Sequence, residues 1–234
     1  MAGVGKIREV AALACGLALL LPSTWADAGA LPAEPVSATA VVATGGKEAV
    51  SAVLARLEKG VAGIATLRTA FTEEKKLAAF RNPVILKGHI CLMKPGKVAW
   101  HVDEPMRYSV VITDKSIRQW DAETGKIVEL KIDRIPVMRT ALDQMRVWFS
   151  GSYSSLQTDY VVRVVSENPV ELEFVPRESN FVRKFIRGVS VGFREDERYL
   201  KWIRITEIGG DTSMMSFDAT ELNPKLDPRD FEVK

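Results

Sequence analysis

Cysteine and histidine are scarce in this 234-residue chain, which contains two of each. Neither Cys-x-x-Cys nor His-x-x-x-His spacing occurs, so the standard zinc-binding patterns are missing. A glycine-rich loop that would cradle a phosphate is missing as well. These absences argue against metal-dependent and nucleotide-dependent enzymes. We therefore expect no metal, no cofactor and no catalytic residue.

An excess of one charge is also lacking. The 32 basic and 30 acidic residues leave a formal net charge of +2. Proteins that bind nucleic acid carry a marked surplus of Lys and Arg on one surface. We therefore expect no nucleic-acid partner.

An apolar run close to the N-terminus, residues 10–21, predicts the cellular compartment. Lys6 and Arg8 precede the run, Pro22 ends it and small residues follow, which is typical of a secretory signal peptide. Its length of about twelve residues falls short of the ~20 that a membrane-spanning helix needs. We therefore expect a signal peptide over residues 1–28 and export to the periplasm.

The two cysteines are interpreted differently. Cys15 lies inside the apolar run, and lipidation there would call for a Leu three positions ahead, where the chain has Ala12. We therefore interpret Cys15 as part of the signal peptide. Cys91 then remains alone in the mature chain, so an internal disulfide is excluded and an apolar core has to stabilise the fold.

Downstream of residue 28 the composition changes again. Residues 29–46 are rich in Ala, Pro and Thr without an amphipathic period, which predicts a disordered leader. Residues 47–234 are long enough for one domain with its own core. A helix is predicted at the start of that domain, before Gly60, from apolar residues at three- and four-residue steps: Val50, Val53, Leu54 and Leu57.

A second helical pattern lies between Pro136 and Gly151. Its apolar residues are Met138, Ala141, Leu142, Met145, Trp148 and Phe149. A face with two methionines adapts readily to irregular surroundings. This face therefore suits both core packing and the covering of a lipid cavity.

Most of the remaining chain has strand character. Runs rich in Val, Ile and Trp between Gly88 and Ile132 are separated by turn residues such as Pro95-Gly96, which predicts an antiparallel meander. Further strands are predicted over residues 160–165, 170–176, 185–193, 199–207 and 212–222. The tail that follows is irregular, and we expect Phe231 to dock onto the domain.

Alternation along the meander places a strongly apolar set of side chains on one face. This set comprises Ile90, Leu92, Val98, Trp100, Val102, Val110, Ile112, Trp120, Val128, Leu130 and Ile132. The other face is mixed, with polar residues such as His101, Gln119 and Glu129.

A motif in the meander resembles a known family. Gly88-x-Ile-x-Leu-x-Lys-Pro-Gly-x-x-x-Trp100-x-x-x-x-Pro105, followed by Val-Ile-Thr-Asp114 and the pair Trp120-Asp121, is similar to the periplasmic outer-membrane lipoprotein carrier (LolA) family. Residues 76–83 resemble a branch of that family linked to envelope-lipid biosynthesis. The resemblance implies an α+β, mainly β fold, in which a strongly curved antiparallel sheet forms a half-open barrel covered by helices. It also implies a strand from about Leu67, although the periodicity of residues 64–76 alone favours a helix.

The resemblance further implies which residues bind lipid. The apolar face of the meander would line a cavity for acyl chains, and the second helix would cover it. The residues so assigned are Ile90, Leu92, Val98, Trp100, Ile112, Trp120, Leu130, Leu142, Met145, Trp148 and Phe149. Lys94 would lie at the rim and contact the covering helix, where the family more often has an Arg with its fork of donors.

The implied function is carriage of lipoproteins from the inner to the outer membrane, without enzymatic activity. The cargo would be a lipidated protein, and the partners an inner-membrane release transporter and an outer-membrane acceptor for a monomeric carrier. Acyl chains suit an apolar cavity because burial of each methylene is worth about 0.8 kcal/mol.

Alternatives remain at this point. The same fold would also serve a handler of another envelope lipid, such as a glycolipid or a polyene lipid, an outer-membrane acceptor, or a structural module with a filled interior. A periplasmic enzyme is an alternative from another class, because His89 and Cys91 share a strand face and would form a thiol–imidazole pair.

Overall fold

The computed structural model describes residues 47–131, 147–148 and 150–233. The predicted signal peptide (1–28), the predicted leader (29–46) and most of the predicted second helix lie outside this part of the chain. Ile132, Leu142, Met145 and Phe149 lie outside it too.

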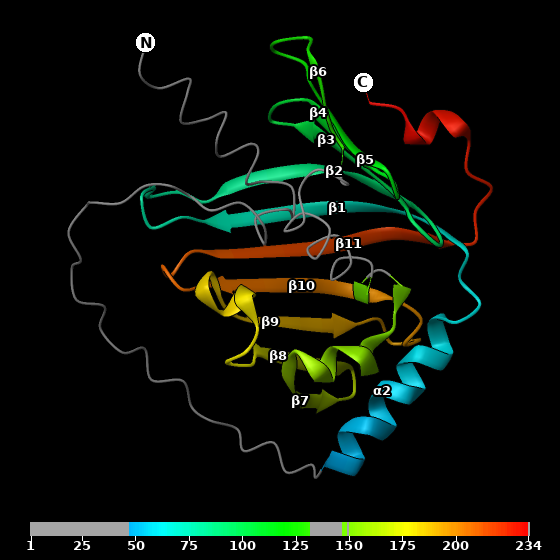
Figure 1. Ribbon diagram of the computed structural model, residues 1–234, viewed down its shortest axis with the longest axis vertical. Helices are drawn as coiled ribbons and strands as arrows, with labels where there is room; N and C mark the ends of the chain where they lie inside the picture. The colour runs from blue at the N-terminus through cyan, green and yellow to red at the C-terminus, as the bar shows by residue number, and fades with distance from the viewer. Residues whose placement is uncertain (1–46, 132–146, 149, 234) are drawn as a thin grey trace.

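The described residues form one eleven-stranded antiparallel sheet with the order β6-β5-β4-β3-β2-β1-β11-β10-β9-β8-β7. Figure 1 shows β3 to β6 standing at a steep angle to β7 to β11, so the sheet bends and twists along its length. The strands are β1 Thr66–Lys76, β2 Val84–Met93, β3 Lys97–Glu104, β4 Tyr108–Ile112, β5 Ser116–Asp121, β6 Ile127–Lys131, β7 Tyr160–Glu167, β8 Val170–Pro176, β9 Ile186–Phe193, β10 Leu200–Glu207 and β11 Thr212–Leu222. The expected open, mainly β architecture is confirmed.

The strand predictions agree closely with this sheet. The meander corresponds to β2 to β6, and the five later predictions correspond to β7 to β11. The strand expected from about Leu67 is also present, as β1. Its neighbours β2 and β11 hydrogen-bond to it on both sides, and this pairing outweighs the helical periodicity of residues 64–76.

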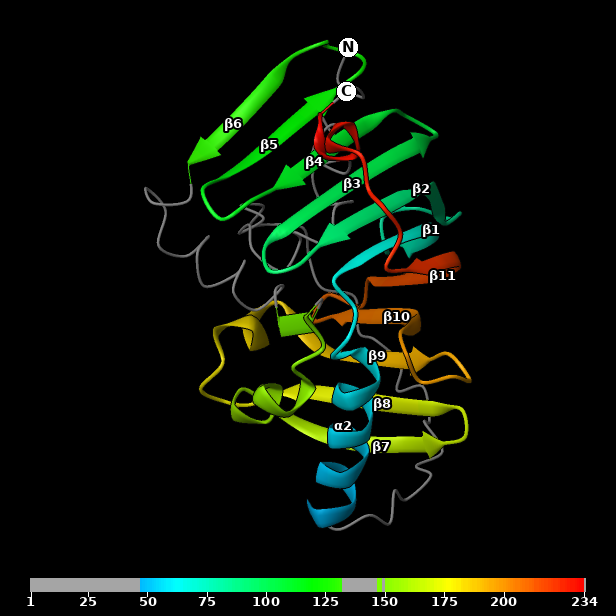
Figure 2. The same ribbon diagram turned by 90° about the vertical axis from the view of Figure 1, so that its right-hand side faces the viewer.

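The predicted first helix is α2, Lys47–Val61, which packs against β7 and the short 3₁₀ helix η3, Tyr153–Thr158 (Figure 2). Its buried side chains are Val53, Leu54, Leu57 and Val61. Within the described ranges, no helix combines the length and apolar character needed to cross a bilayer.

The two faces of the sheet carry different clusters. We call the face with Phe71, Ile90 and Trp100 the inner face, and its buried side chains form one continuous cluster that extends from β4 and β5 to β7 and includes the buried face of α2. The opposite, outer face carries a smaller cluster, made of Cys91, Ala99, Val111 and Val233 with Trp120, Leu226 and Phe231 packed on it. The expected docking of Phe231 is thereby confirmed.

Gly88 marks a close approach between β2 and β3. A Cβ at this position would overlap the backbone carbonyl oxygen of His101. We expect Gly88→Ala to lower the free energy of unfolding by about 2–3 kcal/mol, because neither backbone can move away without breaking the ladder. Denaturant unfolding measures this loss. Gly209→Ala is the matched control, since a Cβ there meets no atom within 4 Å; equal stability of the two variants would contradict the argument.

Candidate functional site

Across β2, β3 and β4 the inner face of the meander is built from apolar side chains in cross-strand register, and these side chains are buried. Two rows cross strands β2, β3 and β4. One row is Ile90, Trp100 and Val110, and the other is Leu92, Val98 and Ile112. Directly opposite side chains lie within packing distance. The structure therefore brings together six of the residues that define the expected apolar face.

Trp100 is the largest side chain in these rows. Its ring centroid lies 5.0 Å from that of Phe71 on β1, at a tilt of 58°. The indole is 6% exposed, and its Nε1 donates no hydrogen bond. A buried donor without an acceptor costs about 1–3 kcal/mol. A ligand oxygen close to Nε1 would recover that cost.

The expected inner-face position of Trp120 is wrong. Trp120 lies opposite Ser109 and Ile127, and it packs on the outer cluster. Gln119, expected on the polar face, takes the inner position opposite Val110. The turn between β4 and β5 pairs Ile112 with Ile117, five positions further on, so the alternation changes parity there.

Two other expected residues lie away from the rows. Leu130 is on the inner face opposite Ile117, but β6 is an edge strand and Leu130 is 40% exposed. Trp148 is buried among aromatic rings of the other half of the sheet, with centroid distances of 4.7 Å to Phe174 and 6.0 Å to Tyr160. The parts played by both residues in lipid binding stay predictions.

Lys94 connects the β2–β3 hairpin to two helix ends. Its Nζ donates to the carbonyl oxygen of Ser150 at 2.9 Å and to that of Val61, the last residue of α2, at 3.3 Å. Carbonyl groups at a helix C-terminus have no partner within the helix and carry partial negative charge, which favours a cation. Burial lowers the pKa of Lys94. The side chain therefore ties the hairpin to α2 and to the helical residues that precede Gly151.

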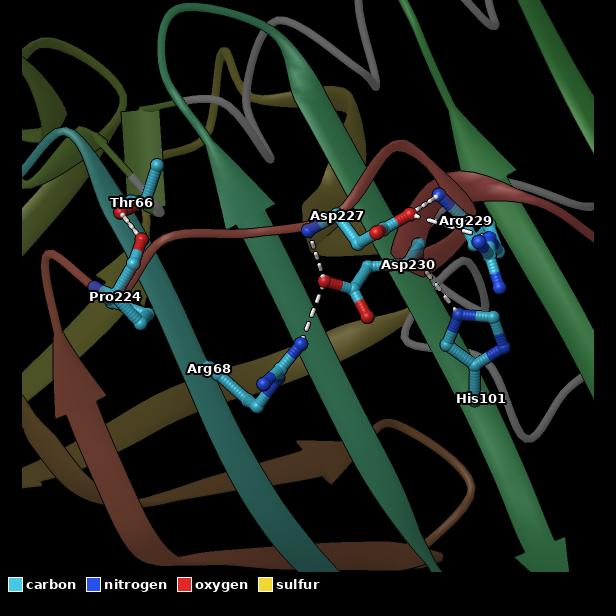
Figure 3. A network of polar contacts seen from close by, with 7 residues as sticks. All are labelled: Thr66, Arg68, His101, Pro224, Asp227, Arg229 and Asp230. Atoms are coloured by element: carbon cyan, nitrogen blue, oxygen red, sulfur yellow. Dashed lines mark hydrogen bonds and ion pairs between the residues drawn. The ribbon is translucent and has the colours of Figure 1, made fainter.

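The C-terminal tail covers the outer face of the same strands (Figure 3). Asp230, in the 3₁₀ helix η5, Pro228–Phe231, accepts a hydrogen bond from Arg68 of β1 at 2.6 Å through its carboxylate. Its backbone oxygen lies 3.1 Å from Nε2 of His101 on β3. Thr66 Oγ1 donates to the carbonyl oxygen of Pro224 at 2.7 Å. The tail is thus anchored to the sheet at several points.

The tail also bears on the thiol–imidazole alternative, because it packs on the cluster that contains Cys91. Cys91 is fully buried, and burial raises the pKa of its thiol, whereas a reactive cysteine is accessible and has a lowered pKa. The ring of His89 stacks on His101 at a centroid distance of 4.7 Å, and its Nδ1 lies 3.3 Å from Asp103. The geometry favours a packing role for Cys91.

The sequence also contains one Gly-x-Ser-x-Gly motif, which was not among the predicted features. Residues 188–192 read Gly-Val-Ser-Val-Gly, the spacing of a nucleophile elbow, which requires a sharp turn from strand to helix. Here the five residues lie inside β9, where Ser190 pairs with Arg204 and Glu173. A serine held in the middle of a ladder does not form such an elbow. The part of the chain that the structure describes contains no group of three His, Cys, Asp or Glu residues suited to a metal ion.

A comparison with known protein families gives a match over most of the chain. The sequence model of the outer membrane lipoprotein carrier protein LolA matches residues 62–234. No curated protein sequence matches the chain.

Three solved structures illustrate the similarity. A LolA superfamily protein from Nitrosomonas europaea is 7% identical, with 78% of this chain and 96% of that chain covered and a TM-score of 0.42. A putative outer membrane lipoprotein-sorting protein domain from Vibrio parahaemolyticus is 8% identical, with 76% and 94% covered and a TM-score of 0.41. The lipoprotein LppX from Mycobacterium tuberculosis is 10% identical, with 76% and 98% covered and a TM-score of 0.45.

The Lys94 contacts lead to a stability prediction. We expect Lys94→Met to lower the free energy of unfolding by about 1.5–3 kcal/mol, because two helix-end carbonyl groups lose a charged donor while the apolar stem is kept. Urea unfolding measures the change. Lys126→Met, at an exposed position of the β5–β6 turn, is the control and should be neutral; a neutral Lys94→Met would show that the contacts stabilise nothing.

The contribution of His101 to stability should depend on pH. Burial lowers the pKa of His101 and the charge of His89 adds to this, while the bond to Asp230 and the charges of Asp103 and Asp230 oppose it. The folded state therefore disfavours the protonated ring, so this contribution to stability is present above about pH 6.5 and is lost as the pH falls toward the lowered pKa. We expect the wild type to lose more stability than His101→Gln between about pH 7.5 and pH 5, measured by denaturant midpoints. An equal loss in both proteins would assign the pH dependence to other groups.

Proposed function

Because this chain belongs to the LolA family of outer membrane lipoprotein carrier proteins, we propose that it is a periplasmic carrier that holds acyl chains of lipoproteins against its inner face. Residues 1–28 would direct its export. A transporter in the inner membrane would load the carrier, and an acceptor at the outer membrane would receive the cargo. The carrier would act as a monomer.

The observation that carries the proposal is the extent of the family match. Residues 62–234 include all strands from β1 to β11 and the tail that crosses the outer face. The match therefore concerns the whole sheet and not an isolated motif.

The chemistry of the inner face supports the same function. Its rows of Ile, Leu, Val and Trp offer apolar contact without catalytic groups. Ten buried methylenes would supply roughly 8 kcal/mol before the cost of ordering the chain is subtracted. The unsatisfied Nε1 of Trp100 would in addition donate to an ester or amide carbonyl at the head of an acyl chain.

Trp100 and Trp120 form a matched pair for testing the binding face, since both tryptophans belong to the meander and they lie on opposite faces. We expect Trp100→Ala to lose most of the lipidated cargo that co-purifies with the wild type, because it removes the largest apolar surface of the rows. Trp120→Ala should retain the cargo. Mass spectrometry of extracts from the purified proteins measures cargo, and circular dichroism checks that both variants are folded. Full retention of cargo by Trp100→Ala would remove this residue from the site.

The same extracts test the kind of cargo. Acylated peptides or proteins support the lipoprotein function. A glycolipid or polyene lipid in their place would contradict lipoprotein carriage and favour a handler of another envelope lipid. Extracts without any lipid, from protein purified under mild conditions, would contradict the carrier function as a whole.

A further inference from the structure

Two charged residues interrupt the apolar inner face in the middle of the sheet. Glu73 and Lys75 belong to β1, which has five strands on either side. Glu73 lies opposite Leu86 of β2 and Met215 of β11, so its side chain points to the same face as these apolar neighbours. Glu73 is 2% exposed and Lys75 is 7% exposed.

Only one of the two carboxylate oxygens of Glu73 has a hydrogen-bond partner. Oε1 of Glu73 lies 3.4 Å from Nζ of Lys75 and accepts a hydrogen bond from Ser213 Oγ at 2.5 Å. Oε2 is buried and has no hydrogen-bond partner. Burial raises the pKa of Glu73, and Lys75 and Ser213 oppose that rise. The ion pair with Lys75 favours the ionised carboxylate, and in that form Oε2 is an acceptor without a donor on the apolar face.

Such an arrangement is costly for the fold alone. Burial of an ion pair costs several kcal/mol, and replacing it by apolar residues of similar volume is often neutral or stabilising. Leu67 and Phe71 lie on the same face of β1 as the charged pair, so this strand accommodates large apolar side chains there. A charged pair with one open acceptor at this position indicates a ligand that brings the missing donor.

We propose that Oε2 of Glu73 accepts a hydrogen bond from a hydroxyl group on the ligand chain, so that the carrier selects hydroxylated acyl chains; this rests on the carrier function proposed above. A neutral donor suffices, because Lys75 lies 3.4 Å from the other oxygen of Glu73 and pairs with its charge, although the charge of Lys75 also acts on Glu207. We assign this donor to the chain and not to a head group, because the neighbours of Glu73 on this face, Phe71, Leu86 and Met215, are apolar and buried.

The first experiment needs no variant. Binding of stearic acid and of its hydroxystearic isomers to the delipidated wild-type protein is measured by calorimetry. At least one isomer should bind about 10- to 100-fold more tightly than stearic acid, the gain expected from one hydrogen bond to a charged acceptor. Equal binding of all probes would overturn the selection and leave the carrier function standing. Failure of every probe to bind would contradict the carrier function itself. Tighter binding of stearamide than of any hydroxystearic isomer would identify an amide donor and overturn the hydroxyl assignment.

The second experiment assigns the preference to the pair. The double variant Glu73→Leu with Lys75→Leu removes both charges together and leaves neither unpaired. It should bind stearic acid at least as tightly as the wild type and lose the preference for the hydroxylated isomer.

The outer face offers a matched control. Glu74 and Lys76 form a solvent-exposed ion pair of 3.2 Å on the same strand, pointing to the opposite face. The variant Glu74→Leu with Lys76→Leu should keep the preference. A preference that survives in the inner-face variant, or that disappears equally in both variants, would overturn the role of Glu73.

Discussion

Pairing between β1 and β11 holds the two halves of this molecule together. β1 precedes the meander β2 to β6, and β11 is the last of the strands β7 to β11 that form the other half of the sheet. Phe71 of β1 lies opposite Phe217 of β11. Because these strands are neighbours, the other nine strands join one sheet and the inner side chains form one continuous cluster. A shift of register by one residue at this pair would turn the apolar side chains of a whole strand to the other face. The binding face therefore depends on this ladder.

The chain itself closes the outer face of the meander. The tail residues Leu226, Phe231 and Val233 cover the small cluster around Cys91, and the bonds of Asp230 hold the tail in place. Lys94 braces the same two strands through the helix ends. Both restraints act on β2 and β3, the strands that carry Ile90 and Trp100. The strands that offer the apolar rows are thus fixed from the outer face and at the hairpin.

A carrier has to bind its cargo and release it again. Apolar contact suits this need, because it is not directional and its strength scales with the area that is buried. The Glu73–Lys75 pair adds a directional hydrogen-bond acceptor at one point of the inner face. In the proposed function, the rows of the meander would supply affinity and the pair would supply selectivity. The two properties then reside in different strands, so substitutions separate them.

Local patterns in the sequence were sufficient for most elements. The helix of residues 47–61 follows from its apolar period, and the meander and the five later strands follow from alternation and turn residues, because these signals act over a few neighbouring residues. Residues 64–76 were the exception among the strands: their period favours a helix, and only pairing with β2 and β11 makes them a strand.

Which face of the sheet each side chain lies on could be determined only from the tertiary structure. Alternation holds within one strand, but the turn after Ile112 changes its parity, so Trp120 and Gln119 exchange faces relative to the expectation. The partners of Lys94 and the burial of Cys91 depend on segments far away in the chain. The sequence by itself determined that this chain forms antiparallel strands with one apolar face, and its family resemblance implied the open sheet. Only the tertiary structure decided which residues share that face and that Glu73 and Lys75 lie buried on it, because register and burial arise from contacts between strands that no local pattern specifies.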